Sequence, residues 1–264
     1  MEEDISPQLL NEWIEIQDSL KKRLITEDGF DWKLPPMKDQ DSEGIEENQD
    51  SNGEILKYVG GVDLSFSRND PLIACATLVV LDISNLEVVH EDSSIIKLRI
   101  PYVPGFLAFR EAPVLLELLD KTKKTSPSLY PQVLMVDGNG LLHPRGFGFA
   151  CHLGVLADLP TIGIGKNLHH VDGLTQSRVR QVLEANGKPR SDIFTLIGDS
   201  GSTLGAAMWT TKGSLKPIFI SVGHRISLAS AIKIVQLSGR FRVPEPIRQA
   251  DIRSKDCLRK HGLS

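Results

Sequence analysis

The order of strand-like and helix-like segments limits this chain to a small number of folds. Three runs rich in apolar and β-branched residues, at 58–66, 73–83 and 87–97, follow one another with short polar connections. This spacing predicts an antiparallel meander of three strands. Helical and extended patterns then alternate: we expect helices at 106–123, 149–159, 176–186 (with Gly187 just after its end), 227–237 and from 247 onward, and strands at 132–137, 161–165, 193–197, 206–211 and 218–222. The order is typical of an α/β protein with a mixed sheet flanked by helices.

The length of 264 residues and the 41% hydrophobic content suit one α/β domain with additional segments. We expect an N-terminal helical extension over 1–34, an acidic flexible loop over 35–56 and the main domain over 57–264. Ser6 and Pro7 are typical of the first residues of a helix. The stretch 35–56 has too few apolar residues to offset the entropy of ordering it.

Neither a membrane nor a secretory protein is indicated. No apolar run approaches the roughly 20 residues of a membrane span, and the acidic first residues do not form a signal peptide. The three cysteines, Cys75, Cys151 and Cys257, are far apart in sequence, which favours reduced thiols over a zinc site. We therefore expect a protein of the cytoplasm, the nucleus or both. We also expect a monomer, because nothing in the sequence demands more.

The charge is unevenly divided along the chain. Residues 1–57 hold 16 acidic and 6 basic residues, whereas residues 58–264 hold 18 acidic and 24 basic residues. The main domain is therefore basic, although the whole chain has a formal net charge of -4. A basic domain suits a polyanionic substrate, and the alternative is a solvated basic helix face.

Four acidic residues occupy positions where the pattern calls for apolar ones. Asp63 interrupts the first strand-like run, Asp137 ends the run 133–137, and Glu111 and Asp251 lie on the apolar stripes of two expected helices. A buried carboxylate costs several kcal/mol unless it is paired or bound to a cation. We interpret the four acids as a divalent-metal site, in which Asp251 is a fourth ligand candidate beside the other three, and therefore as phosphodiester chemistry.

Three of the four acids also have a simpler explanation. Glu111 shares its stripe with Leu107 and Leu115, but a glutamate near a helix start can also reach solvent, favoured by the helix dipole. Asp63 could cap a turn, and Asp251 could form an ion pair with Arg248 or Lys255.

Two glycines stand beside Asp63 in the first strand-like run. Gly60 and Gly61 leave room for something bulky to approach the strand at this point.

Carboxylate oxygens favour Mg²⁺ or Mn²⁺ over zinc. Such ions activate water, orient the scissile phosphate and stabilise the leaving oxygen. His143, six residues after Asp137, and Lys166, just after the strand 161–165, are placed to reach the same phosphate. Alone, either side chain would be interpreted as structural or solvated.

The segment 101–111 carries a second signal. Pro101 and Pro104 stiffen a loop that contains Tyr102, and Gly105 permits a tight turn into the following helix. A rigidly held aromatic side chain beside a nuclease site is suited to insertion between stacked bases. The alternative is that Tyr102 anchors the loop as a half-buried residue.

Several segments together resemble the endonuclease V family. They are Val62-Asp63, the run PYVPGFLAFRE at 101–111, DGNGLLHPR at 137–145, GIGK at 163–166, VGHRISL at 222–228 and PEPIRQAD at 244–251. The resemblance extends from 58 to 252 in the family's order. It implies a ribonuclease H-like fold and an endonuclease that uses Mg²⁺, with Mn²⁺ as a substitute. It also implies a cut at the second phosphodiester 3′ to inosine that leaves 3′-hydroxyl and 5′-phosphate ends.

The resemblance also implies a role for individual residues. It gives Asp63, Glu111 and Asp137 as the metal-binding core and Asp251 as the supporting acid. His143 and Lys166 would contact metal-bound water or phosphate, and Tyr102, with Pro101 beside it, would be the wedge. Gly105, Leu107 and Gly148 would border the pocket for the flipped hypoxanthine.

Two departures from the family bear on the substrate. The acidic stretch 35–56 has no counterpart in compact bacterial members, and His169 stands where an apolar pocket residue is expected. Eukaryotic members favour inosine-containing RNA, whereas bacterial members act on deoxyinosine in DNA. The acidic stretch and the sequence CHLG at 151–154 resemble the eukaryotic branch, so we expect inosine-containing single-stranded RNA as the partner.

Three alternatives remain open at this point. The first is a DNA-repair endonuclease specific for deoxyinosine. The second is a nucleic-acid-binding module without catalysis, which the presence of all four acids disfavours. The third is a metal-dependent phosphatase for small metabolites, which the basic flank and the segment around Tyr102 disfavour.

Overall fold

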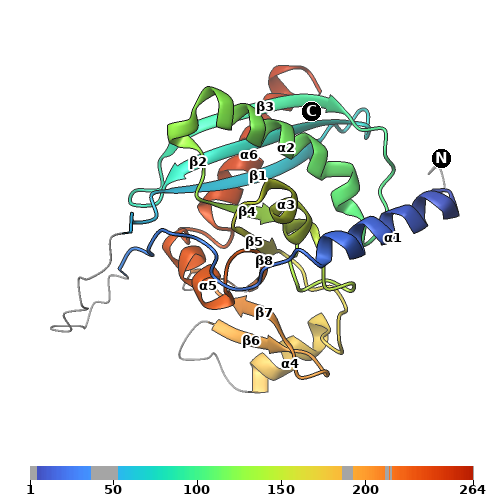
Figure 1. Ribbon diagram of the computed structural model, residues 1–264, viewed down its shortest axis with the longest axis vertical. Coiled ribbons are helices and arrows are strands. Elements are labelled where there is room, and N and C mark those ends of the chain that lie inside the picture. Colours follow the sequence, from blue (N-terminus) through green and yellow to red (C-terminus); the bar gives the residue numbers. More distant parts are fainter. Residues whose placement is uncertain (1–4, 37–52, 186–192, 212–213, 215, 264) are drawn as a thin grey trace.

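A mixed eight-stranded sheet runs through the middle of the molecule (Figure 1). The computed structural model describes residues 5–36, 53–185, 193–211, 214 and 216–263. The strands are β1 (Tyr58–Phe66), β2 (Ile73–Asp82), β3 (Val88–Lys97), β4 (Val133–Asp137), β5 (Thr161–Gly165), β6 (Ile193–Ile197), β7 (Thr203–Met208) and β8 (Ile218–His224). Their order across the sheet is β3-β2-β1-β4-β5-β8-β7-β6.

The strand directions place two of the predicted acids next to each other. The expected meander of β1, β2 and β3 is antiparallel, whereas β4 runs parallel to both β1 and β5. Val62 of β1 lies opposite Val136 of β4, so Asp63 and Asp137 follow at the same level of two neighbouring strands. Side chains alternate along a strand, and these two aspartates therefore project from the same face of the sheet.

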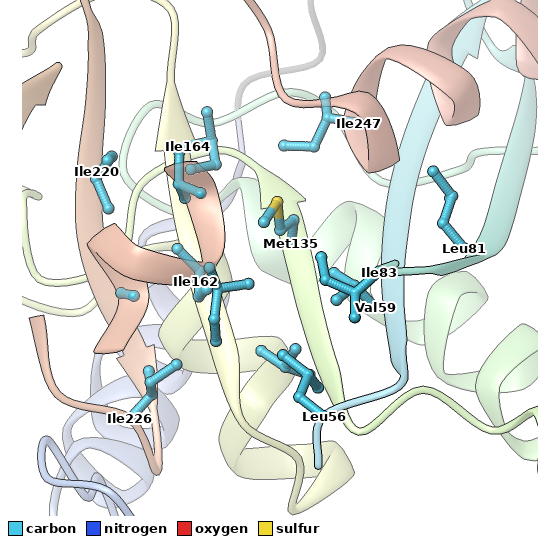
Figure 2. Packing of buried hydrophobic residues seen from close by; sticks show 14 of the residues in the cluster. Leu56, Val59, Leu81, Ile83, Met135, Ile162, Ile164, Ile220, Ile226 and Ile247 are labelled. Carbon is cyan, nitrogen blue, oxygen red and sulfur yellow. The ribbon is translucent and has the colours of Figure 1, made fainter. Parts of the chain in front are cut away.

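Helices cover both faces of the sheet. They are α1 (Pro7–Lys21), α2 (Leu107–Thr125), α3 (Phe149–Ala157), α4 (Gln176–Ala185), α5 (Leu228–Leu237) and α6 (Glu245–Lys260), with a 3₁₀ turn at Pro127–Leu129. α2 and α3 share one core cluster with Val62 and Val136, while α5 and α6 share another with Val59 and Met135. Figure 2 shows Ile247 of α6 above Met135 in this second cluster. The predicted α/β class, a mixed sheet flanked by helices, is confirmed.

Local sequence signals explain where three of the helices begin. The Ser6 hydroxyl accepts a hydrogen bond from the Leu9 N–H at 3.2 Å at the start of α1, and Ser227 does the same for Ser230 at the start of α5. The final helix begins at Glu245 rather than Ile247, because Pro246 fits the first turn of a helix, where no N–H partner is required. The prediction for Gly187 lies outside the described residues.

The hairpin of β6 and β7 begins earlier than expected. We predicted a strand over 206–211, but β7 spans Thr203–Met208. Gly201 has a positive φ of 81° and closes a short turn, in which the Gly198 N–H donates to the Ser202 carbonyl at 3.0 Å. Pairing with β6 can therefore start at Thr203. β8 likewise continues to His224, two residues past the prediction.

The N-terminal helix packs against the body of the molecule, beside α3 (Figure 1). Most of the expected acidic loop, residues 37–52, lies outside the described residues, and Lys33 and Ile55 on either side of it form a parallel bridge. In the described part of the chain, no helix is both long and apolar enough to cross a membrane.

Candidate active site

Asp63 is the buried centre of the acidic group. Its side chain is 8% exposed, and the Ser254 hydroxyl of α6 donates to Asp63 Oδ2 at 2.7 Å. Burial raises the pKa of Asp63, and the negative charges of Asp137 and Asp251 raise it further. The alternative that Asp63 caps a turn is wrong, because it lies within β1.

Glu111 approaches the same group from the first turns of α2. It is 8% exposed, so the alternative that it reaches solvent is wrong. Burial raises the pKa of Glu111 to about 7, and the charges of Asp63 and Asp137 add to this effect. The three predicted ligands therefore lie within electrostatic reach of one another.

Lys166 follows β5 and pairs with Asp137. Its Nζ lies 2.6 Å from Asp137 Oδ2. Burial lowers the pKa of Lys166, but Asp137 and the other acids more than offset this, so the net shift is upward. Arg242 holds the backbone here, because its Nη2 donates to the carbonyls of Lys166 at 3.0 Å and Pro217 at 3.1 Å.

Asp251 lies on α6 at the edge of the group. It is half-buried and forms an ion pair with Lys255 at 2.7 Å, whereas Arg248 pairs with Glu245. The ion pair given above as the simpler explanation of Asp251 is therefore present, with Lys255 and not Arg248 as the partner. Its charge still raises the pKa of Asp63, which places it close to the acidic group.

The carboxylates suit a hard divalent cation in their chemistry. They are oxygen donors from β1, α2 and β4 whose charges repel one another, and a cation would relieve this repulsion. Within the described ranges, however, no three His, Cys, Asp or Glu side chains are already spaced to hold a metal ion. The assignment of Asp63, Glu111 and Asp137 as ligands stays a prediction.

The space beside Asp63 is used by α6. A Cβ on Gly61 would lie 2.2 Å from the carbonyl oxygen of Pro246, and a Cβ on Gly60 would lie 2.7 Å from a methyl group of Leu134. The bulky group for which the glycines leave room is therefore the start of α6 on one side and the core on the other.

A cavity of about 350 Å³ is lined by residues from four parts of the chain: Gln17 of α1, the segment 102–108, the segment 138–149 and His169. Gly138 directly follows Asp137, and Leu107 lies one turn before Glu111 on α2. Its walls include the predicted wedge Tyr102, the three predicted pocket residues and two histidines: Gly105, Leu107, Gly148, His143 and His169. Pro101 is half-buried and is not part of the wall, so it can influence the cavity only through Tyr102 next to it.

The aromatic side chain of Tyr102 lies open at this cavity. It is 58% exposed, so the alternative of a half-buried loop anchor is wrong. Gly105 has a φ of 84°, a conformation that residues with a Cβ rarely adopt. The glycine thus allows the loop that carries Tyr102 to turn directly into α2.

His143 is a neutral side chain in the cavity wall. Burial lowers its pKa to about 4, and the neighbouring charges of His169 and Arg145 act in the same direction. The backbone N–H of Arg145 donates to His143 Nδ1 at 3.2 Å. A neutral His143 therefore carries its proton on Nε2.

Sequence reasoning missed three polar residues that support the site: Gln17, Ser254 and Arg242. Gln17 is 2% exposed between the buried residues Trp13 and Leu20, and Ser254 is fully buried between Ala250 and Leu258. Both are polar residues on an apolar helical stripe, the same signal that identified Glu111. Arg242 gave no signal, because its partners are backbone carbonyls of distant loops.

Comparisons with known proteins agree with the resemblance in the sequence. Residues 40–252 match the family model described as Endonuclease V. The chain is 50% identical to human Endonuclease V over 222 residues, which cover 84% of this chain and 78% of that protein.

Solved structures of Endonuclease V proteins have the same fold as this chain. The catalytic domain of human Endonuclease V matches with a TM-score of 0.87 and 45% identity, over 98% of this chain and 100% of that one. Endonuclease V from Ciona intestinalis, in complex with a 23mer DNA containing an inosine followed by a ribo-adenosine, matches with a TM-score of 0.84 and 32% identity, over 97% and 99%.

Proposed function

Because the chain belongs to the endonuclease V family, whose members are nucleases that act on phosphodiester bonds, we propose that it cuts single-stranded RNA at inosine. The cut falls at the second phosphodiester on the 3′ side of the inosine and leaves a 3′-hydroxyl and a 5′-phosphate. The observation that carries this proposal is the pair of buried acids Asp63 and Glu111, together with a cavity whose wall includes the exposed Tyr102 and the residue after Asp137.

Asp63, Glu111 and Asp137 would hold Mg²⁺, or Mn²⁺ in its place. When bound, the ion supplies activation of the attacking water and stabilisation of the leaving oxygen. Asp251 of α6 would be the supporting acid, because its negative charge adds to the charge that attracts the cation. Ser254 keeps the Asp63 carboxylate in one orientation through its hydrogen bond.

Lys166 and His143 would act on the phosphate. Lys166 is held in its charged form beside Asp137, so its ammonium group can bind a non-bridging phosphate oxygen. His143 is neutral with its proton on Nε2, so it can donate a hydrogen bond to the phosphate without adding charge.

The cavity would receive the hypoxanthine base after it leaves the base stack. Its volume of about 350 Å³ is sufficient for a purine, and Gly105, Leu107 and Gly148 lie in its wall. Tyr102 would fill the gap that the flipped base leaves, since an aromatic ring can stack on the bases that remain.

The sugar preference can be tested with three strands of matched sequence: all-RNA with one inosine, all-DNA with one deoxyinosine, and DNA in which deoxyinosine precedes a single ribo-adenosine. The scissile bond lies 3′ to the nucleotide after inosine, so the third strand restores only the 2′-hydroxyl nearest that bond. We expect efficient cleavage of the first and third strands and at least tenfold slower cleavage of the second. An Asp63→Asn variant controls for contaminating nucleases.

Equal or faster cleavage of the all-DNA strand would move the function to repair of deaminated adenine in DNA. The DNA bound to the Ciona protein favours this second candidate enough to keep it in the test. Binding of the inosine strands without cleavage by the wild-type chain would indicate a nucleic-acid-binding module.

A further inference from the structure

Two walls of the cavity are formed by the loop 102–108 and by the segment 143–149. Gln17 connects these two walls through a single side-chain amide. Its Nε2 donates to the carbonyl oxygen of Gly105 at 3.3 Å and to that of Phe147 at 3.0 Å. Gly105 belongs to the loop that carries Tyr102, and Phe147 precedes Gly148 in the opposite wall. The two carbonyls are far apart in the sequence, and this amide binds both.

The orientation of the Gln17 amide is fixed by a third contact. Its Oε1 accepts a hydrogen bond from Arg145 Nε, so Nε2 has to face the two carbonyls. Arg145 is held in turn by α1, because its Nη2 pairs with Asp18 at 2.8 Å and its carbonyl accepts from Lys21 Nζ at 2.8 Å.

The helix that carries Gln17 is itself anchored to one wall. Trp13, one turn earlier on α1, stacks on Phe109 of α2 with ring centroids 4.8 Å apart, and contacts Phe106 at 6.1 Å. Gln17 is 2% exposed, so its amide has no access to bulk water in place of these partners. α1 is therefore in contact with both the segment 102–109 and the segment 145–147.

We propose that Gln17 is a positioning residue that fixes the spacing of the two cavity walls and thereby sets the preference for hypoxanthine over guanine and adenine. This inference rests on the proposed function. Guanine differs from hypoxanthine by one amino group on C2, and adenine by an amino group in place of the oxygen on C6. A wall that shifts by a fraction of an ångström admits the extra group or changes the distance to the group on C6, so selectivity depends on wall spacing.

The test compares two substitutions that separate the contacts of Gln17. Gln17→Met keeps the volume and removes all three hydrogen bonds. Gln17→Glu keeps the acceptor for Arg145 and removes both donations to the walls. We measure kcat and KM on strands that carry inosine, guanosine or adenosine at one position, at a temperature where every variant is folded.

Both variants are expected to lose at least tenfold in the ratio of kcat/KM for inosine over guanosine and adenosine. KM for the inosine strand rises, and the cut position does not change. The matched control is Ile234→Val, a conservative change in the core under α5, away from the residues that line the cavity. It is assayed at the same temperature, at which it is folded like the Gln17 variants. This control is expected to keep the wild-type ratio.

A wild-type selectivity ratio in both Gln17 variants would overturn the proposal, and so would an equal loss in Ile234→Val. A wild-type ratio in Gln17→Glu alone would also overturn it, because the two donations to the walls would then be dispensable. Failure of the wild-type chain to cut at inosine would instead overturn the proposed function.

Discussion

Glu111 is a buried acid whose charge is unfavourable unless a cation is present, since burial raises its pKa to about 7. Glu111→Gln removes the charge at nearly constant shape. We expect cleavage to fall at least hundredfold, while thermal stability in EDTA at pH 8 stays the same or rises. The control is Glu117→Gln, an exposed position on the same helix, which should cut normally. Normal cleavage by Glu111→Gln would contradict its role as a ligand.

Tyr102 is exposed, so its replacement should affect binding and not folding. Base–aromatic stacking is worth about 1–3 kcal/mol, so Tyr102→Ala should weaken binding to inosine strands by roughly tenfold or more. Tyr102→Phe retains the ring and should bind as the wild type does. Titration of labelled strands measures the Kd values, and equal affinity of the alanine variant would remove the wedge role.

His152 of α3 predicts a pH dependence of stability. Burial lowers its pKa to about 4, against an ordinary value of 6.5, and the ring packs edge-on against Phe109 with centroids 4.9 Å apart. The unfolded chain therefore binds this proton more readily, and stability is lost as the pH falls from 6.5 towards 4.

His152→Leu should remove this contribution. Between pH 7 and pH 5, the free energy of unfolding of the wild type should fall by about 2 kcal/mol more than that of the variant. Urea unfolding of both proteins at the two pH values measures this difference. The other titrating groups are the same in both proteins, so their contributions cancel when the two pH dependences are subtracted. Parallel pH profiles for the two proteins would contradict the assignment.

The residues that the sequence revealed are those that break a local pattern. Glu111 was predictable because its helical neighbours are apolar, and Asp63 because it interrupts a strand. Gln17 broke its stripe in the same way and was missed, since a glutamine carries no charge that demands a partner. Its partners are the backbone carbonyls of Gly105 and Phe147. No pattern within α1 indicates that the segments of these two residues lie against this helix.

At the scale of elements, α6 packs directly on β1 where Gly61 has no side chain. Gly61→Ala would place a methyl group against the backbone of Pro246, which cannot rotate away. We expect a loss of about 2 kcal/mol or more in the free energy of unfolding, together with reduced cleavage, because α6 carries the Ser254 that orients Asp63.

Gly60→Ala is the matched control for Gly61→Ala. Its added methyl group would meet the side chains of Leu134 and Pro131, and the first of these can adjust. We expect a smaller loss of stability and normal cleavage. Equal stability of the two variants would show that the contact of α6 with β1 is not tightly constrained.

Elements with long periodic patterns were predicted within one or two residues, as for β1 and α5. The largest error was in β7, because the tight turn at Gly201 allows pairing to start earlier than the apolar pattern suggests. The contact of Gly61 with α6 could not be predicted, since a glycine in a strand indicates close approach but does not identify what approaches.

At the scale of the whole molecule, the topology assembles the acidic group. The parallel pair β1 and β4 brings Asp63 and Asp137 to one level, and the helices on the two faces contribute Glu111 and Asp251. The sequence predicted the mixed sheet and the chemistry of the acids. It did not by itself predict inosine, which came from the family resemblance, because the cavity is formed by segments that are distant in the sequence.

Mapping the cut tests whether cleavage depends on a metal ion and is directed by inosine. A 5′-labelled single-stranded RNA with one inosine, and its adenosine counterpart, are incubated with the wild type and Asp63→Asn, in Mg²⁺ or in EDTA. We expect a single cut after the nucleotide that follows inosine, which requires Mg²⁺, Asp63 and inosine. A cut elsewhere, equal cutting of the adenosine strand, or full activity of Asp63→Asn would contradict this expectation.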